Sequence, residues 1–254
     1  MRLTTLGTGT ASPSTRVNAG HLVEAGAVTL LMDCGSGVTH RMGAIGANWL
    51  GITHLAITHF HPDHTLDLTT LMFAWKYGTL PARSSPLTIL GPVGIQKLIE
   101  HFAAIYGDSV RAPGFAVEVR EMAPGERVEL GDGVTLEAHK VPHTAESVAY
   151  SVERGGARLV YTGDTGFDTA VAEWARGCDL LLAECSLPEE LAVASHLTPA
   201  QVGVMAEVAE PLRLVLTHFY PPVLDQDIIE IISLRYSGEV VLATDGWSTD
   251  IEER

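Results

Sequence analysis

The sequence has 254 residues and a mass of 27.1 kDa, which is enough for one large domain or two small ones with a buried core. Hydrophobic residues make up 46 % and charged residues 19 %, a composition that excludes disordered and collagen-like chains. The formal net charge of -15 argues against broad binding to nucleic acid or to an anionic membrane.

Short apolar runs bounded by turn residues predict a series of strands along the chain. They cover residues 3–6, 21–23, 29–32, 55–58, 87–90, 134–138, 149–152, 159–162, 180–183, 212–217 and 240–244. Helices are predicted between them at 65–77, 93–106, 168–176, 199–209 and 225–234. No low-complexity linker or short repeat interrupts this pattern, so we predict that residues 1–254 form a single layered α/β domain.

The cysteines and the amino terminus suggest where the protein resides. Cys34, Cys178 and Cys185 are odd in number and show no CxxC spacing, so we expect buried free thiols in a reducing compartment. The first residues, MRLTTLGTGTASP, contain no apolar signal-peptide core. The apolar runs also fall far short of the roughly 18 residues that span a bilayer. We therefore predict a cytoplasmic protein without a membrane partner.

The densest cluster of chemically active residues directly follows the predicted strand 55–58. His59, His61, Asp63 and His64 lie within six residues. Side chains at positions i and i+2 of an extended segment point to the same side, and the following turn can direct Asp63 and His64 to a second point nearby. Imidazole and carboxylate are common zinc ligands, so this motif predicts a metal site with one or two ions.

Three further candidate ligands follow apolar strands in the same way. His143 comes after the Val-Pro of 141–142, Asp164 lies in a Gly-Asp turn after strand 159–162, and His218 ends strand 212–217. Singly, each has an ordinary structural explanation as a core histidine or a turn aspartate. The repeated order of strand and ligand instead places them together at one edge of a sheet stack.

The order of these motifs resembles the metallo-β-lactamase superfamily and, within it, the branch that includes tRNase Z. The resemblance spans nearly the whole chain and is carried by residues 6–9, 31–37, 58–64, 142–143, 162–165, 196–198 and 216–219. It implies an αββα four-layer sandwich with a two-metal site at one edge. His59, His61 and His143 are expected to hold one divalent ion; Asp63, His64 and His218 the other, with Asp164 bridging both.

The resemblance also implies a hydrolytic mechanism. Zinc is the expected metal, with manganese and iron as alternatives for a mixed nitrogen and oxygen ligand set. A hydroxide shared by the two ions would attack a phosphodiester. His196 is the candidate proton donor to the leaving group, Glu184 its orienting carboxylate, and Asp63 a residue that accepts a proton during the attack. Asp33 is expected either to orient the histidine loop or to be a turn aspartate.

The short segment between His143 and Asp164 limits the class of substrate. Only residues 144–163 separate His143 from Asp164, which leaves no room for the protruding arm of tRNA-processing members. We therefore predict a small anionic ester substrate and a phosphodiesterase that does not bind nucleic acid. The alternatives are tRNA 3′ processing and lactone or thioester hydrolysis. A non-catalytic binding module is disfavoured because the ligand set is complete. The apolar helix at 65–77 also suggests a homodimer.

Overall fold

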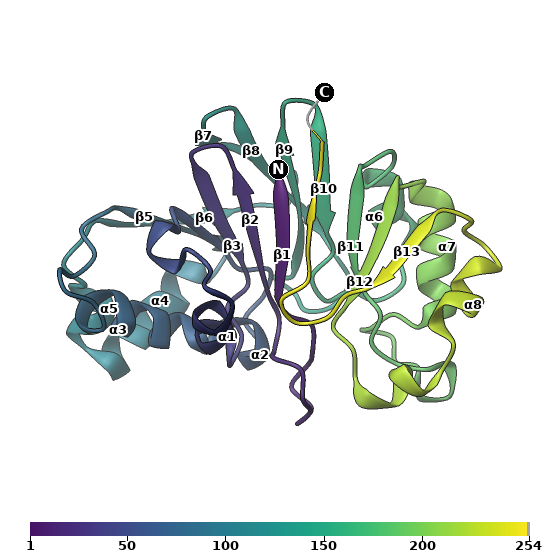
Figure 1. Ribbon diagram of the computed structural model, residues 1–254, viewed down its shortest axis with the longest axis horizontal. Helices are drawn as coiled ribbons and strands as arrows, with labels where there is room; N and C mark the ends of the chain where they lie inside the picture. Colours follow the sequence, from purple (N-terminus) through teal and green to yellow (C-terminus); the bar gives the residue numbers. More distant parts are fainter. Residues whose placement is uncertain (253–254) are drawn as a thin grey trace.

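The apolar runs of the sequence form the strands of two mixed sheets that pack face to face (Figure 1). The computed structural model describes residues 1–252. The first sheet has the order β14-β1-β2-β3-β4-β5-β6, formed by Ser248–Asp250, Arg2–Gly7, Gly20–Ala25, Val28–Met32, His54–Ala56, Leu87–Pro92 and Val117–Met122. The second has the order β13-β12-β11-β10-β9-β8-β7, formed by Glu239–Leu242, Arg213–Thr217, Leu180–Glu184, Ala157–Tyr161, Val148–Arg154, Val134–Lys140 and Arg127–Gly131.

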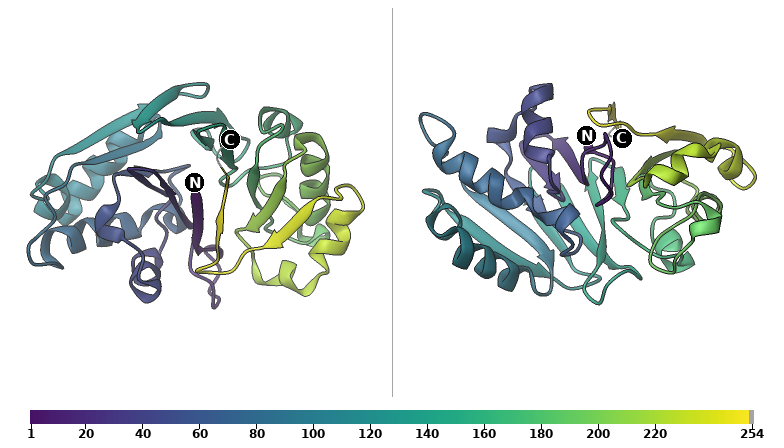
Figure 2. Two further views of the ribbon diagram at one scale, coloured as in Figure 1. Left: turned by 45° about the horizontal axis from the view of Figure 1, so that its top comes forward. Right: turned by 90° about the horizontal axis from the view of Figure 1, so that it is seen from below.

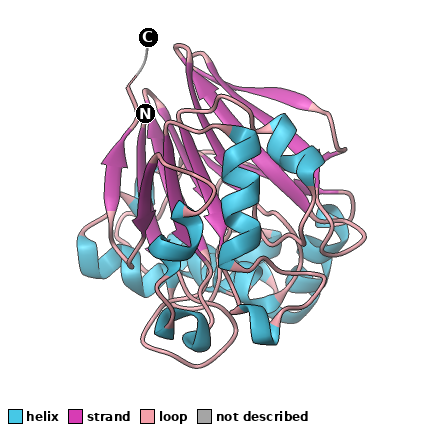
Figure 3. Cartoon of the chain, turned by 90° about the vertical axis from the view of Figure 1, so that its right-hand side faces the viewer, coloured by secondary structure: helices cyan, strands magenta, loops and turns pink. Residues whose placement is uncertain are grey.

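Helices cover both outer faces of the paired sheets, as Figures 1 and 2 show. On the side of the first sheet lie α1 Val38–Ile45, α2 Pro62–Thr65, α3 Asp67–Tyr77, α4 Ile95–Tyr106 and α5 Asp108–Arg111. On the side of the second lie α6 Thr169–Trp174, α7 Pro199–Ala209 and α8 Ile228–Ser233, which stand in front of the strands in Figure 3. Single 3-10 turns occur at Trp49–Gly51, Glu189–Leu191 and Pro221–Asp225. This is the αββα sandwich that we expected.

The alternation of side chains along each strand builds three apolar layers. In β3, Leu30 and Met32 pack between the two sheets, whereas Leu31 packs against the helices of its own side. In β11, Leu182 faces the inner layer and Leu181 faces α7 and α8. Because successive residues of a strand point to opposite faces, a strand covered on both faces must be apolar throughout. This requirement explains the uninterrupted apolar runs.

The strand directions bring the ends of distant segments to one edge of the sandwich. Strands β10, β11 and β12 are parallel neighbours, as are β3, β4 and β5. Their carboxyl ends therefore lie at a common edge of each sheet, which is where ligands bind in open α/β sheets. The first and last strands, β1 and β14, pair antiparallel and keep the two ends of the chain close together (Figure 2).

Several predicted element boundaries were wrong. The strand expected at 55–58 is β4, which ends at Ala56, and the helix expected at 65–77 is divided into α2 and α3. The helix expected from Val93 begins at Ile95, because residues 91–92 still pair with β6. The helix expected at 225–234 is shorter, because Asp227 caps α8. Strands β6, β7 and β14 were missed, since their polar outer residues break the apolar pattern.

The apolar helix α3 contributes to the core with one side only. Leu71, Met72 and Trp75 are buried against the first sheet. Phe73 is not a core residue: it is 56 % exposed and packs beside the exposed ring of Tyr77. The homodimer expected through this region stays a prediction. The three cysteines are free and buried, as expected.

Candidate metal centre

The histidine motif forms an extended loop that turns into a single helical turn. Past the end of β4, His61 is still extended, with φ -63° and ψ 150°. Pro62, which is preorganised for the first position of a helix, starts α2 and places Asp63 and His64 in its first turn. The rings of His59 and His61 lie 4.6 Å apart, which is the i and i+2 arrangement expected from the sequence.

Three loops from the second sheet complete the cluster. His143 follows β8, Asp164 follows β10 and His218 follows β12. The turn before Asp164 needs Gly163, whose φ is +57°, and a Cβ atom there would lie 2.9 Å from the Thr58 side chain. The sequence therefore has a glycine where the loop after β10 meets the loop after β4.

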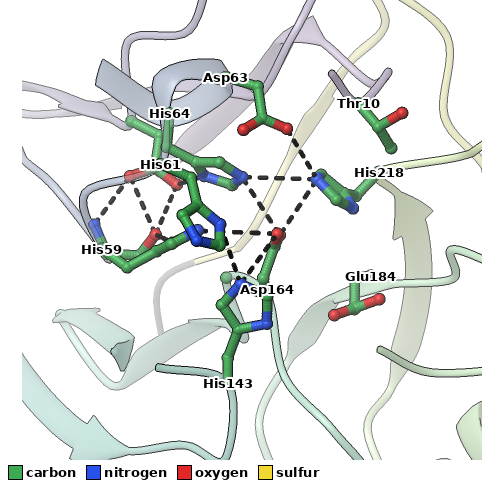
Figure 4. A network of polar contacts seen from close by, with 12 residues as sticks. Thr10, His59, His61, Asp63, His64, His143, Asp164, Glu184 and His218 are labelled. Carbon is green, nitrogen blue, oxygen red and sulfur yellow. Dashed lines mark hydrogen bonds and ion pairs between the residues drawn. The ribbon is translucent and has the colours of Figure 1, made fainter. Parts of the chain in front are cut away.

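Asp164 lies between two groups of histidines (Figure 4), and each of its carboxylate oxygens is near one group. Its Oδ2 is 3.7 Å from Nε2 of His59 and 3.8 Å from Nε2 of His143. Its Oδ1 is 3.2 Å from Nε2 of both His64 and His218. His61 joins the first group and Asp63 the second, with Asp63 Oδ2 3.6 Å from His218 Nε2. The seven predicted ligands thus converge in two groups that share Asp164.

The donor atoms of this cluster fit divalent cations. Nε2 of His59 and Oδ1 of Asp164 are buried and have no hydrogen-bond partner among the residues that the structure describes. Most buried polar atoms in proteins have a partner, and a cation between the two groups would supply one to both of these atoms. Burial, with the neighbouring His64, lowers the pKa of His59 to about 2 and keeps its imidazole neutral. Neutral imidazoles and carboxylates are the ligands that zinc and similar ions prefer.

The carboxylate of Asp33 is hydrogen-bonded to the histidine loop. Its Oδ2 lies 2.8 Å from Nδ1 of His64, and its Oδ1 accepts a hydrogen bond from the Thr58 backbone N–H. The Tyr161 hydroxyl donates a further hydrogen bond of 2.9 Å to Oδ2. The expected hydrogen bond from Asp33 to the loop is therefore present. Because Nδ1 of His64 meets a carboxylate, it carries the proton and leaves Nε2 free for a cation.

A second carboxylate, Glu184 at the end of β11, holds His196. Nδ1 of His196 lies 3.1 Å and 3.2 Å from the two carboxylate oxygens, which also accept hydrogen bonds from the backbone N–H groups of Thr165 and Leu197. Burial lowers the pKa of His196, but the hydrogen bond and charge of Glu184 outweigh burial and raise this pKa to about 9. The predicted pairing of Glu184 with His196 is thus present as a contact.

His196 also lies close enough to the cluster to be considered as a ligand. One ring nitrogen of His196 falls within 4.8 Å of donor atoms of Asp164 and His218. A protonated imidazole has no free lone pair for a metal, and the raised pKa of His196 favours the protonated form. The raised pKa therefore argues against His196 as a metal ligand.

Sequence reasoning missed several residues of the site. Tyr161, which donates to Asp33, looked like an ordinary strand residue. Its position at the end of an apolar strand was a usable signal, because a buried phenol needs a hydrogen-bond partner. Ser186 lies two residues after Glu184 and contacts both Glu184 and His218. The ring of Tyr220 lies 5.9 Å from that of His196 and 6.1 Å from that of His218.

Comparison with known proteins assigns the chain to a family. The model of the Beta-lactamase superfamily domain matches residues 28–219. The chain belongs to this superfamily. Ribonuclease Z of Mycobacterium bovis (strain BCG / Pasteur 1173P2) is 26 % identical over 279 aligned positions, which cover 100 % of this chain and 99 % of the relative.

Two solved structures show the same architecture. The metallo-beta-lactamase fold protein YhfI from Bacillus subtilis has a TM-score of 0.84 at 23 % identity, covering 98 % of both chains. The short form of human tRNase Z has a TM-score of 0.80 at 25 % identity, covering 99 % of this chain and 100 % of the other. Within residues 1–252, no helix has the length and apolar character needed to cross a bilayer.

Proposed function

We propose that this protein of the beta-lactamase superfamily is a metal-dependent phosphodiesterase. The observation that carries the proposal is the division of the Asp164 carboxylate between two groups of ligands, with Oδ2 facing one group and Oδ1 the other. His59, His61 and His143 would hold one ion and Asp63, His64 and His218 the other, with Asp164 between the two groups. Residues from both sheets meet at this site, which supports a single domain over residues 1–254.

The metal pair and the protein side chains have separate tasks. When bound, two divalent cations lower the pKa of water into the neutral range and neutralise charge on the phosphoryl group. His196 lies beside the ligands, held through Nδ1 by Glu184, so its Nε2 is free to protonate the oxygen of the leaving alcohol. Asp63 lies at the same centre, with Oδ2 3.6 Å from Nε2 of His218, and is the candidate acceptor of the proton that the attacking water loses. Zinc is the proposed metal, since imidazole and carboxylate suit it.

The substrate that we propose is a small anionic diester. The net charge of -15 repels polyanions over most of the surface, so attraction of a phosphate depends on the cations and on protonated His196. Between His143 and Asp164 the chain forms β9 and β10, joined by the short turn at Gly155 and Gly156, and no arm extends from this region. A gripping element for a long nucleic acid is therefore missing there.

Processing of tRNA 3′ ends is the second candidate function. It is favoured by the similarity to ribonuclease Z of Mycobacterium bovis, which extends over 100 % of this chain. The same two-ion centre would cleave that phosphodiester. A lactone or thioester hydrolase is the third alternative, since the same centre can direct water to a carbonyl carbon.

A substrate panel with metal analysis tests the proposal. We expect about two equivalents of zinc in the purified protein, and turnover of bis(p-nitrophenyl) phosphate above that of a lactone, a thioester and a precursor tRNA. The variant Asp164→Asn should lose metal and phosphodiester turnover together. Turnover of the lactone or thioester without phosphodiester cleavage would overturn the proposal, and preferred cleavage of precursor tRNA would establish the second candidate.

A further inference from the structure

Ser186 makes contacts that link the metal ligands to the proposed proton donor. We propose that Ser186 is a positioning residue: its hydroxyl fixes the ring of His218 and connects it to Glu184, the carboxylate that holds His196. The proposal rests on the metal centre described above. It assigns a role to a side chain that the reaction scheme does not otherwise use.

The contacts come from the extended segment after β11. Ser186 lies two residues beyond Glu184, so both side chains point to the same side of the segment. Its Oγ contacts Oε2 of Glu184 and lies 3.0 Å from Nδ1 and 3.0 Å from the carbonyl oxygen of His218. Ser186 and Glu184 are fully buried, and His218 is 1 % exposed. Water therefore does not compete for these hydrogen bonds.

The numbers of donors and acceptors limit which of these contacts can be hydrogen bonds at the same time. A serine hydroxyl has one proton, whereas an ionised carboxylate and a carbonyl oxygen can only accept. The carboxylate of Glu184 is the stronger acceptor, so Ser186 donates to it. Nδ1 of His218 must then donate its own proton to the Ser186 oxygen. His218 is fixed as the Nδ1–H tautomer, and its Nε2, which faces Asp164 and Asp63, keeps a free lone pair for a cation.

The two histidines of the second ligand group are therefore held in different ways. Nε2 of His64 and Nε2 of His218 lie 3.4 Å apart, and the other ring nitrogen of each is engaged. His64 is held directly by the carboxylate of Asp33 at 2.8 Å. Nδ1 of His218 instead meets the hydroxyl of Ser186, which in turn contacts the carboxylate of Glu184. The carboxylate of Glu184 also accepts a hydrogen bond from Nδ1 of His196. Binding of a metal at His218 and the placement of the proton donor therefore depend on the same buried carboxylate.

The consequence of losing the hydroxyl follows from this arrangement. In Ser186→Ala, Nδ1 of His218 and one oxygen of Glu184 each lose a partner, and the ring of His218 is free to adopt the other tautomer. Removal of an outer hydrogen-bond partner of a metal ligand typically costs about 10- to 100-fold in metal affinity. Ser186→Thr retains the hydroxyl. Ser151→Ala is the matched control, since Ser151 is also buried and accepts a hydrogen bond from Arg158.

Metal retention under a chelator tests the proposal without a substrate. Each purified protein is titrated with a chelator, and the metal content is measured after equilibration. We expect Ser186→Ala to release one of its two ions at a roughly 10- to 100-fold lower chelator concentration than the wild type. Ser186→Thr and Ser151→Ala should release theirs near the wild-type concentration. Equal release from Ser186→Ala and Ser151→Ala, or equal weakening in the Ala and Thr variants of Ser186, would overturn the proposal.

A second measurement remains decisive if the alanine variant folds poorly. Nitrogen-15 spectra of histidine-labelled, metal-free wild-type protein report which ring nitrogen of His218 carries the proton. We expect a proton on Nδ1 of His218, and an unprotonated Nδ1 would contradict the proposed role of Ser186. If the wild-type protein binds no metal, the proposed function fails, whereas the tautomer still tests Ser186. The two failures are thereby distinguished.

Discussion

Replacement of Glu184 by Gln tests the proposed acid function most directly, because it removes a charge with little change in shape. The carboxylate holds His196 and accepts hydrogen bonds from Thr165, Ser186 and Leu197. The amide of Gln can accept on one side only, so its NH2 group must face donors on the other. The variant therefore loses the interaction that raises the pKa of His196 to about 9.

The size of the effect depends on pH. With a pKa of about 9, roughly 0.9 of His196 is protonated at pH 8, whereas with the ordinary value of about 6.5 this fraction is roughly 0.03. The protonated fraction of His196 at pH 8 thus falls about 30-fold in Glu184→Gln. Burial without the carboxylate would lower this fraction further. At pH 6, with the ordinary value of about 6.5 in the variant, both forms are mostly protonated and the difference is less than about twofold.

Substrates with different leaving groups distinguish loss of the proton donor His196 from a general loss of activity. A p-nitrophenolate departs without a proton, whereas the alkoxide of a dinucleotide needs one. We therefore expect turnover of a dinucleotide phosphodiester to fall by up to about 30-fold at pH 8 and the alkaline limb of its pH profile to move to lower pH, because Glu184 no longer raises the pKa of His196. Turnover of bis(p-nitrophenyl) phosphate should change much less.

Glu137→Gln is the matched control, because Glu137 is a partly buried carboxylate that accepts a hydrogen bond from Trp174 away from the site. This variant should keep the wild-type pH profile with both substrates. A uniform loss of turnover in Glu184→Gln, independent of pH and leaving group, would refute the assignment of His196 as the acid and make Glu184 a structural residue.

Three further outcomes are expected. Tyr161→Phe should lower the free energy of unfolding by about 1.5–3 kcal/mol in urea titrations, because a buried hydrogen bond to the Asp33 carboxylate is lost; an unchanged value would contradict this. Gly35→Ala should reduce metal content, since its Cβ would lie 1.9 Å from the Asp63 carbonyl oxygen, whereas Gly43→Ala meets open space and should retain metal; equal metal content would contradict the steric argument. Binding of zinc to metal-free protein should release a proton from His64, measurable by calorimetry in two buffers. Burial lowers the pKa of His64, but Asp164 and Asp33 raise it well above the usual value; no net proton release would refute this.

The positions of the seven candidate ligands could be anticipated because each follows a strand. A strand end fixes where the next side chain lies, so His143, Asp164 and His218 converge once their strands share an edge. The boundaries of the intervening helices could not be derived in the same way. The start of α4 at Ile95 depends on the pairing of residues 91–92 with β6, a segment distant in sequence. Asp227 caps α8 through a local hydrogen bond from the Glu230 backbone N–H, a signal that the sequence does contain.

The hydrogen-bonded residues around the ligands were harder to anticipate. Tyr161, Ser186 and Thr58 are ordinary strand or turn residues in the sequence, and their roles depend on which buried atom they meet. Tyr161 meets a carboxylate from a segment 128 positions away. The local sequence pattern does not predict a contact between residues so far apart. A buried phenol needs a hydrogen-bond partner, and this need can at least identify Tyr161 as a residue with a polar contact.

The charge balance of the centre explains how an acidic protein can attract an anionic substrate. Four buried carboxylates, Asp33, Asp63, Asp164 and Glu184, lie in or directly behind the site. In the metal-free protein, protons on His64 and His196 offset part of this charge, which is why the carboxylates raise the pKa values of these two residues. Two divalent cations would balance all four carboxylates and displace the proton of His64. The protonated ring of His196 then remains as a local positive charge, on the side where a leaving group needs a proton.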